Sequence, residues 1–576
     1  MIQYNIATPR IHRRELEVQM QLPVPADRNV FTLHLPYWRP GRYERQMYER
    51  NISTLISPDP EVRIERKTTH TWEISARKSE HVTLQYRYYA NRLDAGGAFT
   101  DEDLVYFNPV NLLLFDPIRP DMPCSMEVNL PPDFEAVCAL PRQGHCWFAP
   151  NADALMDAPF LASRNMQHHV FTVCDTHMHI WLHGAHTPDF IKLENAFKAF
   201  TEAQVRVMGD LPCDDFHFFF LISEGRSYHG VEHPDSTVIT LGPAAELMQG
   251  QVWNDLLSIS SHELFHLWNV KRIRPADMVP YDYTQEQYSR LHDITEGFTT
   301  YYGELMLLRP GVWSLDEWLK EMNAILQKHL DAPGKANTSL TDASFNSWIN
   351  GYHNEGLAEL KISFYHKGAL TAMLLDLRLR QHTDGKHSLD NLMQRLYADY
   401  KKPGYTGYTR EDIQAHLKAL GFVDADAFYH DFVDGNADVL AALQSILPSF
   451  GLQLNAMPSS SFTRHTLGLR MVRNTDNKLM VTEVLPGSPA AESSLHPGDI
   501  LHALDGIELA SEDPDTDFQY ACTLKDSITI TYTTRGIRRS TNLQIPSQRF
   551  DTVYAFSALP EADDEVLKRR KDWLGC

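Results

Sequence analysis

Residues 262–275 read His262-Glu-Leu-Phe-His-Leu-Trp-Asn-Val-Lys-Arg-Ile-Arg-Pro275. Positions four apart lie on one face of an α-helix, so His262 and His266 can bind one metal ion while Glu263 lies beside them. A pattern of only five residues, such as H-E-x-x-H, can occur by chance. Here the flanking sequence is strongly apolar and predicts a buried helix over about residues 252–269, in which unpaired polar groups are costly unless a metal ion binds them. The stretch therefore predicts a catalytic metal site.

A catalytic zinc ion usually takes three protein ligands and leaves one position for water. The best third ligand is Glu296, an acid within an apolar run on the next expected helix, at about residues 285–308. Asp293, one turn earlier, is the competing ligand, and if Glu296 binds the metal we expect Asp293 to hold an imidazole N–H. Asn269 either supports His266 in the same way or caps the helix end. The predicted cofactor is one zinc ion per chain, although such ligands also bind cobalt or manganese.

Composition excludes several classes of function. The 576-residue chain has a formal net charge of −22, which opposes binding to nucleic acid. We find no apolar stretch long enough to span a membrane and no signal-peptide core in the first twenty residues. The seven cysteines show no CxxC spacing, which argues against a cysteine zinc site and is typical of reduced thiols. We therefore expect a cytoplasmic protein without membrane or nucleic-acid partners.

The chain is long enough for three or four domains. Residues 1–185 alternate in short runs between Pro and Gly and predict a β-rich domain, whereas residues 186–450 are mainly helical in pattern. Residues 455–547 return to strands and turns and predict a separate β domain. The charged residues 548–576 form either a small helix or a loose tail. The expected fold class is multidomain α+β.

Beyond H-E-x-x-H, residues 262–275 resemble the signature of the glycyl aminopeptidase family, gluzincin metallopeptidases with a C-terminal PDZ domain. Three further segments, in the same order, resemble the family motifs W-x-P-G-S-Y, G-G-L-E-H and Y-x-K-G. They are Pro36-Tyr-Trp-Arg-Pro-Gly-Arg-Tyr43, Gly230-Val-Glu-His233 and Tyr365-His-Lys-Gly368. Arg42 replaces the usual Ser, and His229 replaces the first Gly of the second motif, which leaves backbone contacts at residue 229 in doubt. The resemblance extends over nearly the whole chain.

The resemblance implies a saddle-like or sandwich N-terminal β domain and a thermolysin-like catalytic domain. It also implies a PDZ-like domain, since Leu467-Gly468-Leu469 resembles a carboxylate-binding loop. In that family Tyr365 would stabilise the oxyanion as a phenol donor, while Glu232 and Gly230 would bind the substrate and its free α-ammonium group. The preferred substrates would be peptides with N-terminal Gly or Ala. The PDZ-like loop would take peptide C-termini by strand addition.

The expected function is hydrolysis of an N-terminal peptide bond, with Glu263 as general base and then acid. Two other readings remain open at this stage. One is a gluzincin endopeptidase, which would cleave N-blocked peptides equally well. The other is an inactive scaffold that binds peptides through its PDZ-like domain.

Overall fold

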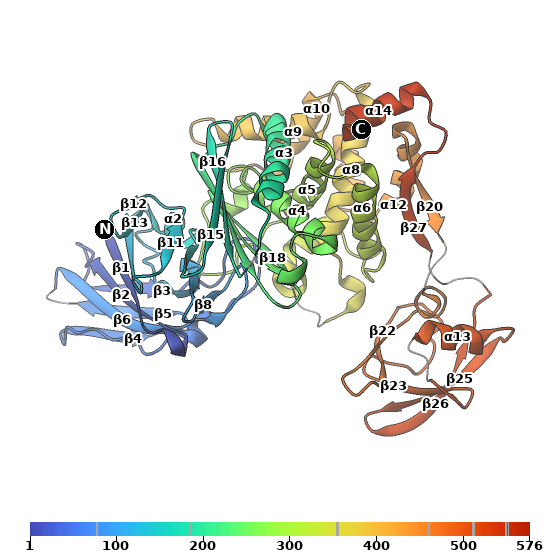
Figure 1. Cartoon of the computed structure of the whole chain (residues 1–576), viewed down its shortest axis with the longest axis horizontal. Coiled ribbons are helices and arrows are strands. Elements are labelled where there is room, and N and C mark those ends of the chain that lie inside the picture. Colours follow the sequence, from blue (N-terminus) through green and yellow to red (C-terminus); the bar gives the residue numbers. More distant parts are fainter. Residues whose placement is uncertain are drawn as a thin grey trace.

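The structure, a computed structural model, describes residues 1–76, 79–184, 187–352, 356–457, 461–509, 513–547, 550 and 552–576. Three bodies follow one another along the molecule: a β-rich N-terminal body, a central body of helices on a sheet, and a small C-terminal β body (Figure 1). This agrees with the predicted multidomain α+β class.

The N-terminal body is built from three sheets. Strand β2 (Glu15–Pro23) alternates buried and half-buried residues along its whole length, as expected for a strand with one face on a core. The largest sheet has the order β12 (Arg142–Gln143), β13 (Cys146–Ala149), β10 (Cys124–Asn129), β1 (Ile2–Arg10), β2, β6 (His81–Tyr89). The second has the order β11 (Glu135–Cys138), β14 (Phe160–Ser163), β9 (Leu104–Phe107), β8 (Ala98–Thr100), β7 (Asn91–Arg92). The third has the order β3 (Val30–His34), β5 (Thr71–Ala76), β4 (Val62–Arg66).

The central body begins earlier than the predicted border at residue 185. Its five-stranded sheet has the order β15 (Gln167–Val173), β16 (Thr176–His183), β17 (Asp215–Ile222), β19 (Ser236–Gly242), β18 (Ser227–His233). Strand β16 runs parallel to β17, and the buried side chains of β15 and β16 join the core beneath helix α3 (Phe190–Met208). The strands at 167–183 therefore belong with the helices that follow them. Alternation predicts that a strand exists but not which sheet it joins.

Helices cover this sheet and carry the site. They are α4 (Gly250–Phe265), α5 (Thr299–Leu308), α6 (Leu315–Leu330), α7 (Leu340–Phe345), α8 (Phe364–His382), α9 (Leu389–Tyr400), α10 (Arg410–Ala419), α11 (Ala425–Phe428) and α12 (Val439–Ile446). The helix expected over 285–308 begins only at Asp293, with a π-helical segment, Asp293–Phe298, that continues into α5. Within the described residues, no helix is long and apolar enough to cross a membrane.

The C-terminal β body is an insertion in the central body. Strand β20 (Leu452–Met457) enters it, and β27 (Val553–Ala558) leaves it and pairs antiparallel with β20. Between them lie β21 (Leu469–Arg473), β22 (Leu479–Val484), β23 (Ile500–Leu504), β24 (Ile507–Glu508), α13 (Pro514–Cys522), β25 (Ser527–Thr534) and β26 (Ile537–Gln544).

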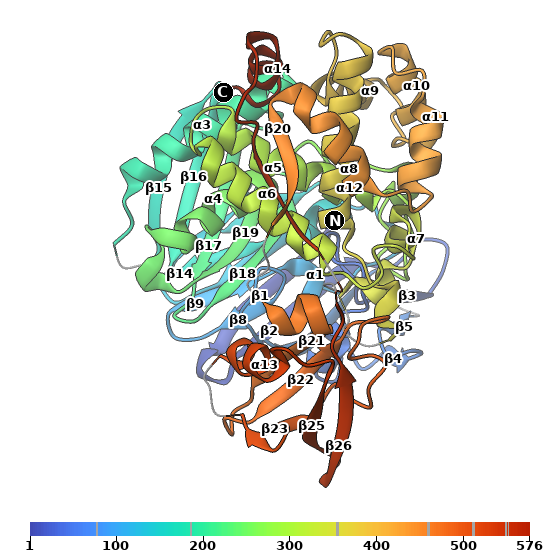
Figure 2. The ribbon, with the colours of Figure 1, turned by 90° about the vertical axis from the view of Figure 1, so that its right-hand side faces the viewer.

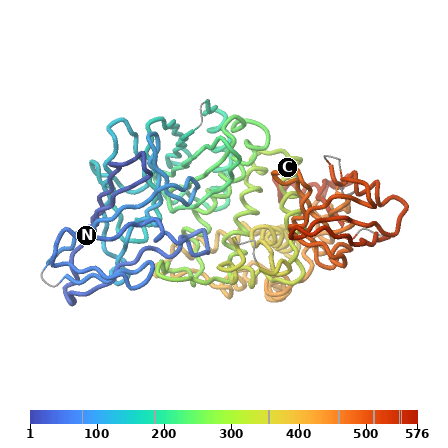
Figure 3. The backbone as a smooth tube through the Cα atoms, turned by 90° about the horizontal axis from the view of Figure 1, so that it is seen from below, coloured from blue at the N-terminus to red at the C-terminus, as the bar shows by residue number. Residues whose placement is uncertain are grey.

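Residues 548–576 are thus not a tail, as far as they are described. Figures 2 and 3 show the chain end returning to the central body after β27. Helix α14 (Asp564–Leu574) buries Trp573 completely, and the indole N–H of Trp573 donates to the hydroxyl of Tyr301 in α5 at 2.7 Å. The charged composition of this segment gave no indication that two of its residues, Trp573 and Leu574, are buried.

Candidate metal centre and substrate cleft

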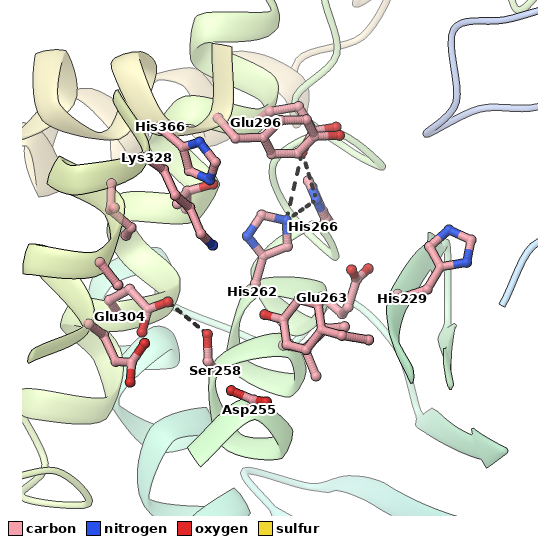
Figure 4. A pocket seen from close by; sticks show the side chains of 18 of the residues that line it. His229, Asp255, Ser258, His262, Glu263, His266, Glu296, Glu304, Lys328 and His366 are labelled. Atoms are coloured by element: carbon pink, nitrogen blue, oxygen red, sulfur yellow. Dashed lines mark hydrogen bonds and ion pairs between the residues drawn. The ribbon is translucent and has the colours of Figure 1, made fainter. Parts of the chain in front are cut away.

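Three side chains from two helical segments converge on one point (Figure 4). His262 on α4 and His266 at its C-cap bring their Nε2 atoms to 3.0 Å from each other. The Oε2 atom of Glu296 lies 3.7 Å from Nε2 of His262 and 3.4 Å from Nε2 of His266. Two nitrogens and one carboxylate oxygen at this spacing are the donor set that a tetrahedral zinc site takes from a protein.

Hydrogen bonds orient His266 for this role. Its Nδ1–H donates to the backbone carbonyl of Asn269 at 2.7 Å, so Nε2 carries the lone pair that faces the site. Asn269 is itself fully buried, and its side-chain amide donates to the carbonyl of Ile294 at 2.8 Å and to the hydroxyl of Thr299 at 3.0 Å. Asn269 therefore joins the end of α4 to the segment that carries Glu296.

Asp293 lies elsewhere. Among the described residues its Oδ1 atom has no hydrogen-bond partner, and both ring nitrogens of His266 are occupied without it. Burial raises its pKa to about 6, against the opposing effect of Arg410. The structure does not bring Asp293 to either imidazole. The π-helical segment rotates successive residues by less than an α-helix does, so spacing counted on an α-helix misplaces it.

Two glycines bring Tyr365 to the metal ligands. A Cβ added at Gly297 would lie 2.7 Å from Cα of Gly368, so the π-helical segment and α8 touch backbone to backbone. Tyr365, one turn before Gly368, consequently faces the cavity, with its ring centroid 6.5 Å from that of His262. Burial first, and Glu296 next, raise the pKa of Tyr365 well above its usual value. Its phenol is thus a proton-bearing donor at neutral pH.

Glu263 points into the same cavity from the opposite wall. A Cβ at Gly230 on β18 would lie only 2.1 Å from its Oε1 atom, so a residue with a side chain there would displace the carboxylate. Burial raises the pKa of Glu263 to about 8, in the absence of a metal ion. A carboxylate with such an affinity for protons suits a general base.

Glu232 is held in a buried network of charges. It is 5% exposed at the end of β18, and its Oε1 atom lies 3.9 Å from Nζ of Lys271. Lys271 donates to Asp157 at 2.7 Å, and Nδ1 of His233 lies 2.7 Å from the other oxygen of Asp157. Burial would raise the pKa of Asp157, but Lys271 and His233 hold it below its usual value. Lys271 lies within residues 262–275. Its positive charge therefore interacts with both the Asp157 and the Glu232 carboxylates.

The N-terminal body completes the cleft. A Cβ at Gly41 would lie 2.5 Å from Oε2 of Glu232, so this glycine packs directly on the carboxylate. Trp38 is fully buried and donates its indole N–H to the carbonyl of Asp282 at 2.7 Å, while Tyr43 stacks on His292 at 3.9 Å between ring centroids. The sequence of residues 36–43 resembles a family motif but predicted no role for these residues. Trp38, Gly41 and Tyr43 of this segment all contact the central body.

The charges at the ligand cluster favour a bound cation. Although burial would lower the pKa of His266, the carboxylate of Glu296 raises it to about 9, and the two histidines hold the pKa of Glu296 far below its usual range. Without a metal ion the cluster compensates Glu296 by taking up a proton. A zinc ion bound by His262, His266 and Glu296 would supply that positive charge instead, so the residues present fit the metal.

The cavity that holds these residues has a volume of about 440 Å³. It continues from the metal ligands along the earlier turns of α4, past Ser258 to Asp255, and is closed by α5 and α6. On that side Ser258 donates to Oε1 of Glu304 at 2.7 Å, and burial raises the pKa of Glu304 to about 8. A peptide that enters the cavity can therefore extend well beyond the metal ligands.

Comparison with known families agrees with this geometry. The family model of the M61 glycyl aminopeptidase matches residues 255–371, which contain all three metal ligands, Glu263 and Tyr365. The model of the peptidase M61 N-terminal domain matches residues 3–164, and that of the PDZ domain matches residues 457–530. The match to residue 164 agrees with the earlier border of the N-terminal body. A search of curated proteins found no match.

One solved structure shares the fold over the whole chain. An aminopeptidase N family protein from Idiomarina loihiensis superposes with a TM-score of 0.90 and 24% identity, with 100% of both chains covered. An M1 zinc metallopeptidase from Deinococcus radiodurans has a TM-score of 0.47 and 13% identity, over 76% of this chain and 94% of that one. The likeness to the first structure includes every part of this chain.

The family matches thus fall on both the cleft and the N-terminal body that completes it. The chain belongs to the M61 glycyl aminopeptidase family of metallopeptidases and carries a PDZ domain near its C-terminus.

Proposed function

We propose that the protein is a zinc-dependent aminopeptidase that releases an N-terminal Gly or Ala from peptides. The position of Glu232 carries this proposal. Carboxylate oxygens of Glu232 and Glu263 and a ring nitrogen of His266 lie within 4.8 Å of one another. In a peptide only one Cα separates the terminal nitrogen from the first carbonyl, about 2.5 Å away. An ammonium group bound by Glu232 therefore leaves the first peptide bond, and no later one, at the metal ligands.

Each residue has a task in the reaction. When bound, zinc would act as a Lewis acid on the scissile carbonyl and lower the pKa of water. Glu263 accepts the proton of the attacking water and passes it to the leaving amine. Tyr365 donates a hydrogen bond to the oxygen that gains negative charge. Glu232 pairs with the α-ammonium group, whose desolvation is costly without a carboxylate.

The preference for a small first residue is supported by the family description and by the crowding around Glu232. Gly41 packs on its carboxylate, and Tyr352 lies over this region, with its hydroxyl 3.5 Å from the carbonyl of Gly41. These groups leave little room for a large side chain next to the ammonium group.

The deciding experiment compares a free and an N-acetylated glycyl-alanyl peptide as substrates of the purified, zinc-loaded protein. We expect hydrolysis of the free peptide only, with loss of activity after chelation of the metal. Glu232→Gln should lower kcat/KM by about 10² or more, because it removes the partner of a desolvated charge. Glu224→Gln, a change at an exposed acid before β18, serves as the matched control.

Equal cleavage of both peptides would make the protein an endopeptidase. Cleavage of neither by metal-loaded protein would favour a peptide-binding scaffold instead.

A further inference from the structure

An acid of the catalytic body pairs with two arginines of the PDZ domain. Asp331, the C-cap residue of α6, forms ion pairs with Arg464 and Arg470 of the PDZ domain, the latter at 2.6 Å. Gln327, one turn earlier, donates to Oδ1 of Asp331 at 2.6 Å. An acid is electrostatically unfavourable at a helix C-terminus, where the macrodipole is negative. The two arginines offset that cost.

Both arginines border the loop that resembles a carboxylate-binding loop. Arg464 lies in the π-helical turn Thr463–Leu467 directly before Gly468, and Arg470 is the second residue of β21 directly after it. Gly468 has φ +77°, and a Cβ there would lie 2.2 Å from Oγ of Ser488, so the loop tolerates no side chain at this position. The amide of Gly468 already donates to the carbonyl of Arg464 at 3.0 Å. The arginine side chains are therefore the groups of this loop that face an external acid.

The sheet edge beside this loop has the layout of a peptide site. In the described sheet β21 is the edge strand, with only β22 as its neighbour. Helix α13 is tied to the same loop, because the amide of Thr463 donates to Asp515 at 2.6 Å. A peptide added along β21 would direct its C-terminal carboxylate toward the loop. The carboxylate that pairs with the arginines at the loop end of β21 is that of Asp331.

We propose that Asp331 occupies the carboxylate site of the PDZ domain in cis, and that a peptide with a free C-terminal carboxylate binds there only by displacing Asp331 from Arg464 and Arg470. The ion pairs suit such an exchange. The side chains of Asp331 and Arg464 are 18% and 14% exposed, and that of Arg470 is 35% exposed and also pairs with Glu483 at 3.3 Å. The pair with Arg470 is the more exposed of the two, and a competing carboxylate replaces it first.

Helix α6 connects this contact to the catalytic cleft. Ala324, Ile325 and Lys328, all within three turns of Asp331, line the cavity. Asn323 fixes the same helix to β27 through two hydrogen bonds with the backbone of Phe556, at 2.6 and 3.1 Å. Displacement of Asp331 releases the C-terminal end of α6 and thereby alters the cavity wall that carries Lys328. This second step rests on the proposed peptidase function, whereas the exchange at Asp331 does not.

The test measures peptide binding by fluorescence anisotropy. It uses the full chain with Glu263→Gln, so that the result does not depend on peptidase activity. The probe is a pool of N-terminally fluorescein-labelled hexapeptides of random sequence with free C-terminal carboxylates. The same pool with C-terminal amides is the control probe. We expect Asp331→Asn to bind the carboxylate pool about tenfold more tightly than the parent, because an internal competitor has been removed. Arg464→Gln should weaken binding, and the amide pool should bind neither protein.

Asp316→Asn is the matched control protein. It makes the same charge change on an exposed residue of the first turn of α6, far from the PDZ domain. Equal affinity of the Asp331→Asn and Asp316→Asn proteins for the carboxylate pool, including no binding by either, overturns the proposal. So does equal binding of the carboxylate and amide pools.

The coupling through α6 is measured with the active enzyme. We expect Asp331→Asn to change KM for a free glycyl-alanyl peptide severalfold while Asp316→Asn does not. An unchanged KM together with tighter binding of the carboxylate pool would overturn the coupling and leave the exchange at Asp331 standing.

Discussion

The catalytic cleft and the PDZ loop each contain charges suited to one end of a peptide, but they are built differently. In the cleft, Glu232 is 5% exposed and shares a buried network with Lys271, Asp157 and His233. In the PDZ loop, Arg464 and Arg470 are partly open to solvent and pair with an acid from another body. A buried charge has one permitted arrangement because every alternative leaves it unpaired. The pair with Arg470, the more exposed of the two arginines, can exchange partners at less cost than a fully buried pair.

This difference suits their tasks. A site that places one bond against a general base must hold its charges rigidly, since small displacements cost rate. A site that senses a ligand needs a contact that can be released. We therefore expect changes in the cleft to act on rate by large factors and to leave the PDZ loop unaffected.

Glu263→Gln should lower kcat for a glycyl-alanyl peptide by about 10³ to 10⁴, because the amide cannot accept the proton of the attacking water. Binding of the carboxylate peptide pool at the PDZ loop should be unchanged. The zinc content of the variant, measured by mass spectrometry, should equal that of the parent, since Glu263 is not a ligand. Activity within tenfold of the parent would refute this assignment.

Trp573→Ala should destabilise the central body by about 3 to 5 kcal/mol, because it removes a fully buried indole that contacts Trp318 and Phe450 and donates to Tyr301. Denaturant unfolding followed by circular dichroism measures this change. Trp253, which is only partly buried beneath Lys192, provides a milder comparison as Trp253→Ala. A small effect at Trp573 would show that the chain end contributes little to the body that holds the cleft.

Tyr365→Phe should lower kcat by about 10² to 10³ with little change in KM, because the phenol donates only to the oxygen that gains charge in the transition state. Steady-state kinetics on the free glycyl-alanyl peptide separate the two constants. Tyr400→Phe, on α9 away from the cavity, is the control. A rise in KM alone would assign Tyr365 to substrate binding.

Glu304→Gln should change how stability depends on pH. Burial raises the pKa of Glu304 from 4.5 to about 8, so the folded state holds its proton more tightly than the unfolded chain does. The stability that this group contributes is fully present below pH 4.5 and is lost progressively as the pH rises toward 8. The Glu304→Gln variant has no titrating carboxyl group at this position, so it does not lose stability in this way. Urea unfolding of both proteins at pH 5 and pH 8 should show the free energy of unfolding of the parent falling relative to that of the variant as the pH rises. Glu224→Gln, at an exposed acid, is the control. Equal differences at the two pH values would contradict this.

Much of the architecture was accessible from sequence patterns. The β-rich start, the helical middle and the separate β domain near the end were all predicted, because hydrophobic periodicity and turn residues are local properties. The identification of that last domain as PDZ-like came from the family resemblance. The two borders that differed depend on pairing. Strands β15 and β16 join the later sheet, and β27 returns to β20 across the whole PDZ domain. Neither strand pairing can be recognised from the local sequence.

The residues of the candidate site also divide into those that local sequence patterns predict and those that they do not. His262, Glu263 and His266 follow from helical spacing, and Glu296 from the need for a third ligand near them. Tyr365 and Glu232 required a family resemblance, since an isolated tyrosine or glutamate carries no signal of its role. Gly41 and Asp157 went unnoticed as parts of the cleft. Both precede the metal helix by more than 90 residues and reach it only because the N-terminal body packs on the central one.

The amino-acid sequence alone predicted the helix of His262 and His266, a general base beside them, a zinc ion as cofactor and the order of the domains, because these depend on spacing within one element or on composition. Only the tertiary structure decided that Gly41 packs on the Glu232 carboxylate, that Oδ1 of Asp293 has no hydrogen-bond partner among the described residues and that Asp331 pairs with Arg464 and Arg470. Such contacts join elements far apart in the chain. They exist only once burial of apolar surface has fixed how those elements pack.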